Sequence, residues 1–250
     1  MQLVENIFLR GNEKAVLLLH SYTSNAKEMQ YLAKALHHEG YTCYAPNLAG
    51  HGGSPEHLFA SSIEQVAACS KEAVKFLIEK KYETIYVIGQ SLGGVLSIRL
   101  ANEFPQIKAV CIISSPILER PAVELEKRAA HFSRRYLKNN GRSEQEIQEF
   151  MSEHFPRPIE KFLAFQQFIV KSGKEVQAMK QPLFLAKGAL DEDVFHKSID
   201  LIEQTVNGNI VCKKLYNNSG HLISLGKERE LLAEDILTFL KQIEKRTVSS

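Results

Sequence analysis

A serine stands between two glycines in the segment Gly-Gln-Ser-Leu-Gly at residues 89–93, which fits the pattern G-x-S-x-G. An apolar run of strand length at residues 84–88 leads into this segment, and a helical run at residues 94–102 follows it. A strand–turn–helix setting of this kind presents a nucleophilic serine, because the turn is too tight for side chains at its glycine positions. The alternative for Ser91 is an ordinary helix-capping residue in a glycine-rich turn.

A serine hydroxyl becomes an effective nucleophile when a histidine removes its proton, and that histidine needs a carboxylate partner. Among nine histidines, His221 is the candidate base, because it lies on a loop between the last predicted strand and the last predicted helix. Asp191 is the candidate acid, because the predicted strand at residues 182–188 runs directly into its turn. Asp193 is the nearest rival. The alternative for both carboxylates is a solvated turn that caps the next helix.

Residues so far apart in the chain need a scaffold that brings them to one edge of a sheet. Short apolar runs alternate with amphipathic segments in the first half of the chain, which predicts βα units around a mostly parallel sheet with helices on both faces. Residues 3–10 alternate weakly and predict an antiparallel edge strand or hairpin. The other predicted strands are residues 15–20, 42–47, 84–89 and 109–114, and the predicted helices between them are residues 25–38 and 62–81.

The alternation stops after Pro116. Up to about Gln181 the chain has charge-rich helical stretches, among them one that begins with a capping box of Ser143 and Glu146. Residues 117–181 are therefore predicted to form a helical insertion between strands. The helices expected there are residues 122–139 and 159–171, and the later elements are residues 182–188, 195–206, 209–216 and 228–245.

Six aromatic side chains occur at helical spacings in this insertion. Such stripes most often pack against a core, so we expect most of the six to contact the sheet domain and a minority to face the cleft. They are Phe132, Tyr136, Phe150, Phe162, Phe165 and Phe168.

Five segments resemble bacterial carboxylesterases and monoacylglycerol lipases of the α/β-hydrolase superfamily. The resemblance covers essentially the whole chain, and Ser91, Asp191 and His221 follow one another in the order that this superfamily uses. The segments are LLLHSYTSN (residues 17–25), GYTCYAPNLAGHG (40–52), GQSLGG (89–94), GALDEDV (188–194) and SGHLISLGKERELLAEDILTFL (219–240).

The resemblance implies a single α/β-hydrolase domain over residues 1–250 with Ser91, Asp191 and His221 as its catalytic triad. It also implies that the backbone N–H groups of Tyr22 and Leu92 form the oxyanion hole, and that residues 117–181 form a small helical cap over the acyl pocket.

The chain departs from the family at Ser21, which follows His20 where the family usually has a glycine. A positive φ at this position would strain Ser21 or reshape its loop, and would change activity or substrate choice.

These assignments predict a serine carboxylesterase that hydrolyses short- to medium-chain esters through an acyl-enzyme on Ser91. Monoacylglycerols and simple esters are the expected small-molecule substrates. Two alternatives stay open: a thioesterase with the same triad, and a non-catalytic ligand-binding protein that retains the fold.

Composition argues against several other classes of protein. The net charge of +2 is spread over both signs, so we expect no nucleic-acid partner, and no stretch reaches membrane-spanning length. Residues 1–14 lack a secretory signal pattern. Serine chemistry needs no cofactor, and the four cysteines lack metal-ligand spacing, so we expect buried, reduced thiols in a cytoplasmic protein without metal. They are Cys43, Cys69, Cys111 and Cys212. The sequence indicates no particular oligomeric state.

Overall fold

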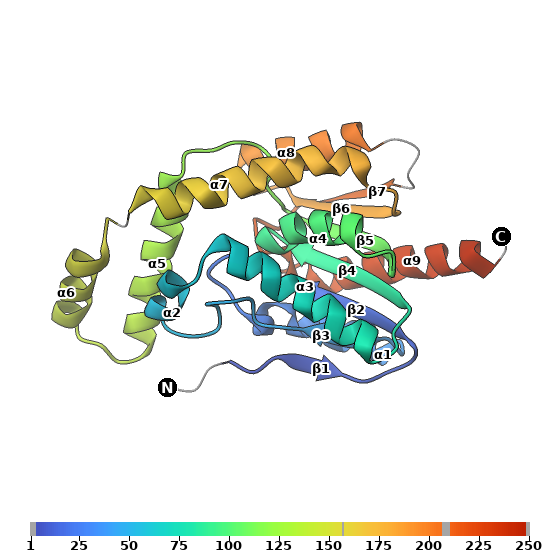
Figure 1. Ribbon diagram of the computed structural model, residues 1–250, viewed down its shortest axis with the longest axis horizontal. Helices are drawn as coiled ribbons and strands as arrows, with labels where there is room; N and C mark the ends of the chain where they lie inside the picture. The colour runs from blue at the N-terminus through green and yellow to red at the C-terminus, as the bar shows by residue number, and fades with distance from the viewer. Residues whose placement is uncertain (1–3, 157, 207–210, 249–250) are drawn as a thin grey trace.

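A seven-stranded sheet forms the centre of the molecule in the computed structural model, which describes residues 4–156, 158–206 and 211–248 (Figure 1). The strand order is β1-β3-β2-β4-β5-β6-β7, with β1 antiparallel to β3 and the other pairs parallel. The strands are β1 Ile7–Leu9, β2 Lys14–Leu19, β3 Thr42–Ala45, β4 Thr84–Gln90, β5 Ile107–Ile113, β6 Leu183–Gly188 and β7 Val211–Tyr216. The predicted mostly parallel sheet is confirmed; residue 3 and residues 209–210 of the predicted strands lie outside the described residues.

Helices cover both faces of the sheet, because alternate strand residues point to opposite sides and both sides are apolar. In β2, Leu17 and Leu19 belong to the core on one face of the sheet, which also contains residues of α3, α4 and α8. Val16 and Leu18 pack with α1 and α9 on the other face. The helices are α1 Gln30–His38, α2 Pro55–Ala60, α3 Ile63–Glu79, α4 Leu92–Glu103, α5 Val123–Asn139, α6 Glu144–His154, α7 Ile159–Lys174, α8 Asp193–Thr205 and α9 Arg229–Val248.

Local sequence signals explain where several helices begin. Ser143 and Glu146 form the predicted capping box at the start of α6. Helix α2 was not among the predicted elements, because six residues are too few to show a helical period. It begins with Pro55 directly after Ser54, a favourable pair of residues for a helix start.

The segment between β5 and β6 contains α5, α6 and α7 and, among its described residues, no strand. Figure 1 shows α5 and α6 projecting at one end of the molecule, whereas α7 runs back alongside the sheet. Leu137, Ile147 and Met151 form a small separate core between α5 and α6. This pair of helices therefore has a core of its own beside the main one.

The four cysteines are free thiols. Cys43 and Cys111 are buried as predicted, but the prediction is wrong for Cys69 and Cys212, which are half-buried. Cys212 lies on β7, an edge strand that has a neighbouring strand on one side only. Within the described ranges, no helix combines the length and the apolar character needed to cross a membrane.

Candidate active site

The turn between β4 and α4 holds Ser91 at φ 54° and ψ −115°, a conformation that side chains rarely adopt. A Cβ atom added at Gly89 would lie 2.1 Å from the carbonyl oxygen of Gly93, and one added at Gly93 would lie 2.0 Å from that of Leu19. Both contacts are with backbone, so neither position accepts a side chain. The two glycines thus permit a strained turn that presents the Ser91 hydroxyl at the carboxyl edge of the sheet.

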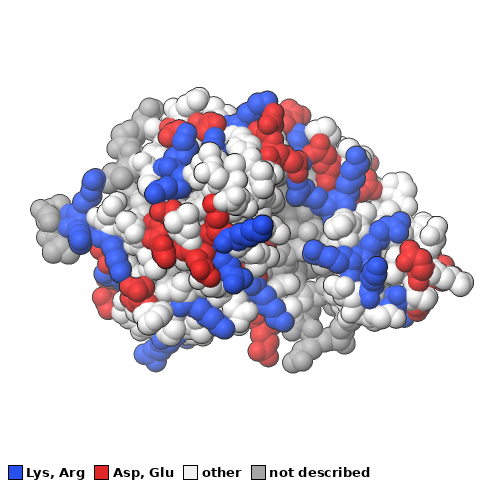
Figure 2. Space-filling model, turned by 180° about the vertical axis from the view of Figure 1, so that it is seen from behind, with Lys and Arg blue, Asp and Glu red and all other residues white. Residues whose placement is uncertain are grey.

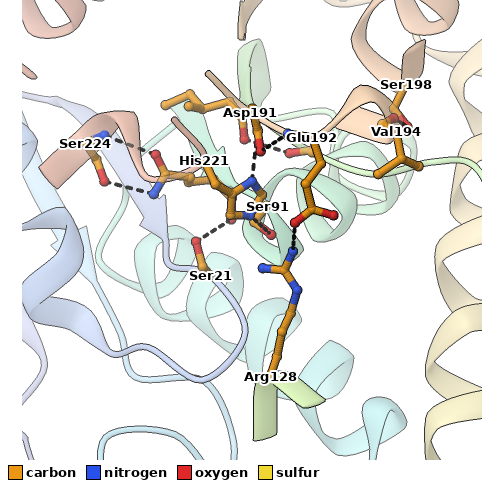
Figure 3. A network of polar contacts seen from close by, with 12 residues as sticks. Ser21, Ser91, Arg128, Asp191, Glu192, Val194, Ser198, His221 and Ser224 are labelled. Carbon is orange, nitrogen blue, oxygen red and sulfur yellow. Dashed lines mark hydrogen bonds and ion pairs between the residues drawn. The ribbon is translucent and has the colours of Figure 1, made fainter. Parts of the chain in front are cut away.

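Ser91, His221 and Asp191 form a chain of hydrogen bonds after the ends of β4, β7 and β6 (Figure 3). His221 Nε2 lies 2.9 Å from Ser91 Oγ, and His221 Nδ1 lies 3.0 Å from Asp191 Oδ2. An ionised carboxylate only accepts hydrogen bonds, so Nδ1 carries the proton and Nε2 is free to accept the proton of the serine. The Asp191 side chain is 2% exposed, which keeps water from competing for His221. This geometry can activate a hydroxyl nucleophile.

Asp193, the rival acid, does not contact His221. Its side chain is 90% exposed and lies 3.9 Å from Lys197 Nζ, within the first turns of α8. It therefore occupies the position of the solvated helix-start carboxylate that the sequence offered as an alternative.

Phe195 supports the imidazole from the side. Its buried ring packs on His221 with 4.1 Å between the ring centroids, and the Arg120 guanidinium lies over the same Phe195 ring at 5.1 Å. This contact is not predictable from the sequence, because Phe195 lies at the start of an ordinary amphipathic helix and nothing in its spacing indicates a histidine neighbour.

Tyr22 and Leu92 both line the cavity of about 590 Å³ into which Ser91 and His221 open. Tyr22 follows β2 and Leu92 begins α4, which follows β4. Strand β3 lies on one side of β2 and the next strand in the chain, β4, lies on the other side, so the strand order reverses at β2. The cavity lies at this reversal, which is the usual ligand site of such sheets. The first-turn N–H of Leu92 has no acceptor within its helix.

Ser21 does not adopt a positive φ, so its backbone lacks the strain that a side chain would suffer in that conformation. Its buried hydroxyl and its backbone N–H both donate to Glu28 Oε1, at 2.8 and 3.0 Å. The described non-glycine residues with positive φ are Thr23, Lys81, Ser91 and Ser114.

A buried polar network lies beneath the candidate triad. Gln90 Nε2 donates to Glu28 Oε1 at 2.9 Å and to Ser224 Oγ at 2.9 Å, while the Ser224 N–H donates to Gln90 Oε1 at 3.1 Å. Burial raises the pKa of Glu28. The network joins the loop after β2, the Ser91 turn and the loop after His221, and it was missed because its members lie in unrelated segments of the sequence.

Two neutral histidines brace the loops on the other side of Tyr22. His20 Nδ1 donates to the Ser21 carbonyl oxygen at 2.8 Å, and His20 Nε2 accepts from the Leu48 N–H at 3.1 Å. Burial lowers the pKa of His20 to about 3 and that of His51 to about 4. The two rings lie 5.1 Å apart, so protonating either one costs more than in water.

We expect stability to fall as the pH decreases from about 6.5 to about 5, because the unfolded chain protonates both histidines while the folded protein does not. Each histidine contributes a slope of about 1.4 kcal/mol per pH unit. Urea unfolding at a series of pH values measures this slope. His51→Gln should reduce the slope by the contribution of one histidine, about 1.4 kcal/mol per pH unit. An unchanged slope would show that His51 is not kept neutral in the folded protein.

A second cavity, of about 310 Å³, adjoins the first. Tyr22, Leu92 and Phe165 line both cavities. Of the six aromatic residues predicted to pack or to face the cleft, Phe162 and Phe165 belong to the main core and also line the second cavity. Phe132, Phe150 and Phe168 pack against the main core, and Tyr136 packs against the small core between α5 and α6. The other apolar side chains of the second cavity are Leu58, Phe59, Ile63, Val66 and Ala164.

Residues 11–228 match the serine aminopeptidase S33 family. The chain is 32% identical over 235 residues to a carboxylesterase of Bacillus subtilis (strain 168), an alignment that covers 94% of this chain and 95% of that protein. It is 24% identical over 237 residues to a thermostable monoacylglycerol lipase of Bacillus sp. (strain H-257), covering 94% and 93% of the two chains.

Solved structures agree with this fold. A structure from the work on the metagenome-derived lipolytic enzymes LipS and LipT superposes with a TM-score of 0.73 at 20% identity, covering 95% of this chain and 97% of that chain. The monoacylglycerol lipase of Paleococcus ferrophilus superposes with a TM-score of 0.69 at 18% identity, covering 97% and 100%. The match over residues 11–228, together with the 32% identical relative, shows that the chain belongs to the serine aminopeptidase S33 family and has the α/β-hydrolase fold.

Proposed function

We propose that this protein is a serine carboxylesterase that hydrolyses short- to medium-chain carboxylic esters through an acyl-enzyme on Ser91. The observation that carries this proposal is the hydrogen-bonded chain from Ser91 Oγ through His221 to the buried Asp191 at the edge of a cavity. The names of the carboxylesterase and monoacylglycerol lipase relatives support the ester as the bond that is cleaved.

In the first half of the reaction, Ser91 Oγ attacks the ester carbonyl carbon while His221 Nε2 accepts the hydroxyl proton. Asp191 stabilises the imidazolium that forms and keeps its Nδ1–H oriented. The backbone N–H groups of Tyr22 and Leu92 bind the carbonyl oxygen as it becomes negative, and each such donor lowers the barrier by about 3 kcal/mol.

Collapse of the tetrahedral intermediate breaks the bond to the alcohol, and His221 gives its proton to the departing oxygen. The acyl group stays on Ser91. A water molecule then attacks the acyl-enzyme carbonyl while His221 Nε2 accepts a proton from it, and the second collapse returns that proton to Ser91 Oγ and releases the carboxylic acid.

The two cavities suit the two halves of an ester. Tyr22 and Leu92, which bind the carbonyl oxygen in this mechanism, line both cavities, whereas Ser91 and His221 line only the wider one. We assign the cavity of about 310 Å³ to the acyl chain because aromatic and aliphatic side chains form most of its wall, and the wider cavity to the alcohol that His221 protonates. Helix α7 supplies Phe162 and Phe165 to these walls, so residues 117–181 act as a cap over the site.

Peptide cleavage, which the family description names, receives less support from the site. An aminopeptidase needs an acidic group for the substrate ammonium. The acids of the wider cavity are Glu124 and Glu192, and each is already paired with an arginine. Glu64 and Glu160 line the second cavity, but both are exposed to solvent.

A series of p-nitrophenyl esters from acetate to palmitate tests the proposal. We expect kcat/KM to peak at short or medium acyl chains and a fluorophosphonate probe to label Ser91, as located by mass spectrometry. Matched acyl-CoA thioesters and an aminoacyl p-nitroanilide serve as comparison substrates. Faster cleavage of either comparison substrate would replace the esterase assignment, and an unlabelled, inactive protein would favour a ligand-binding role.

A further inference from the structure

The wider cavity has a basic wall. Lys127, Arg128, His131 and Arg135 line it from α5, at spacings of three and four residues that place them on one helix face. Figure 2 shows the molecule from behind, where Lys and Arg side chains border a hollow beside the projecting helices.

Part of this charge is neutralised within the wall. Arg120 Nε donates to Glu124 at 2.7 Å, Arg120 also pairs with Glu192 at 3.0 Å, and Arg128 pairs with Glu192 at 2.6 Å. These two arginines and two glutamates cancel in charge. They also tie α5 to the turn that carries Asp191.

Lys127 and Arg135 are the two basic residues of the wall that these ion pairs do not include. Both side chains are exposed on the cavity wall, and neither forms an ion pair with an acid among residues 4–156, 158–206 and 211–248. The wall therefore carries about two uncompensated positive charges, of which Arg135 borders this cavity and Lys127 borders both this cavity and a neighbouring groove lined by Met151 and Phe155. A charged wall in a recess between protein surfaces focuses its field on what enters.

The position of this wall relates it to one part of the substrate. His221 opens into this cavity and not into the apolar one. In the proposed mechanism His221 protonates the leaving alcohol, so the alcohol extends toward α5 while the acyl chain extends toward Phe162.

From these contacts we infer that Lys127 and Arg135 form a leaving-group subsite for an anion, and that the preferred esters carry a carboxylate or a phosphate on the alcohol side. This inference rests on the proposed esterase function. It names the substrate class of the same site, because ammonium and guanidinium groups bind both anions by the same charge-assisted hydrogen bonds.

Two matched pairs of esters test the inference with the full chain. The first pair is 4-nitrophenyl butanoate and 5-butanoyloxy-2-nitrobenzoate, which differ by one carboxylate on the leaving group. The second pair is 1-butanoylglycerol and 1-butanoylglycerol 3-phosphate, which differ by one phosphate. We expect kcat/KM for the anionic member to exceed that of the neutral member by about 10-fold in at least one pair at low salt. The pair with the larger ratio identifies the anion.

The double variant Lys127→Gln/Arg135→Gln should lower that ratio by about 10-fold. The matched control is Arg134→Gln/Lys138→Gln, which removes the same two charges from α5 at exposed positions that do not line this cavity, and should leave the ratio unchanged. Raising the ionic strength from about 0.02 M to about 1 M should lower the wild-type ratio, since screening shortens the range of the charges.

The outcomes separate the two proposals. Hydrolysis of both members at equal rates, or an equal loss of preference in the control variant, would overturn the anion subsite and leave the esterase intact. Absence of hydrolysis of all four esters would overturn the esterase assignment, on which the subsite depends.

Discussion

Replacing Ser91 with alanine is expected to lower kcat for p-nitrophenyl butanoate by about 10⁶-fold, to the level left by binding and the oxyanion hole. The loss is this large because the proposed mechanism has no other nucleophile within reach of His221 Nε2, which lies 2.9 Å from Ser91 Oγ. Initial rates and labelling by a fluorophosphonate, both normalised to folded protein by circular dichroism, measure the effect.

A matched control for Ser91→Ala is Ser152→Ala, which removes an exposed hydroxyl on α6. The control should retain both wild-type turnover and the label. Fold should persist in both variants, because Ser91→Ala removes one side-chain hydrogen bond and leaves the glycines of the turn in place. Substantial turnover by a folded Ser91→Ala protein would show that another residue acts as the nucleophile.

Asp191→Asn is expected to lower kcat by about 10⁴-fold. The amide is neutral and presents donors as well as an acceptor, so it no longer stabilises the imidazolium and it permits the tautomer in which His221 Nε2 carries the proton. Its size matches the carboxylate that lies 3.0 Å from His221 Nδ1, so packing is preserved. Steady-state rates over a range of pH values measure the loss.

Asp193→Asn supplies the comparison for this variant. It makes the same chemical change two residues away, on a side chain that is 90% exposed and does not contact His221. We expect nearly wild-type rates. A large loss of kcat in Asp193→Asn together with a small loss in Asp191→Asn would show that Asp193 is the acid.

The proposed triad depends on groups that do not react. Phe195 packs on one side of His221, and the buried Glu28 and Gln90 join the loop of Tyr22 to the turn of Ser91. A reacting hydroxyl, a base and an oxyanion site must be held within fractions of an ångström, and buried hydrogen bonds between the loops contribute to this rigidity.

Much of the architecture could be read from local patterns. The strands between the two edge strands are mostly apolar runs whose alternate residues face two buried sides, as Leu17 and Leu18 do, and such a run can be recognised in a window of a few residues. The glycines around Ser91 can also be interpreted from the sequence, because a tight strand-to-helix turn has no room for a Cβ atom at these two positions. Short elements such as α2 escaped prediction because they contain less than two turns of pattern.

The remaining features depend on which distant segments meet. The sequence favours Asp191 over Asp193 as the acid, and the loop after β7 decides between them in space by bringing His221 to Asp191. The sequence alone does not reveal the φ of Ser21 or its hydrogen bond to Glu28, both of which depend on how the loop after β2 folds. In the sequence, the basic residues of α5 form an ordinary charged helix face. They become a candidate binding surface because the fold places them in the wall of the cavity that His221 also lines. Periodicity and turn sterics act between near neighbours in the chain, whereas charge pairing, burial and pKa shifts depend on contacts between residues far apart, which exist only after folding.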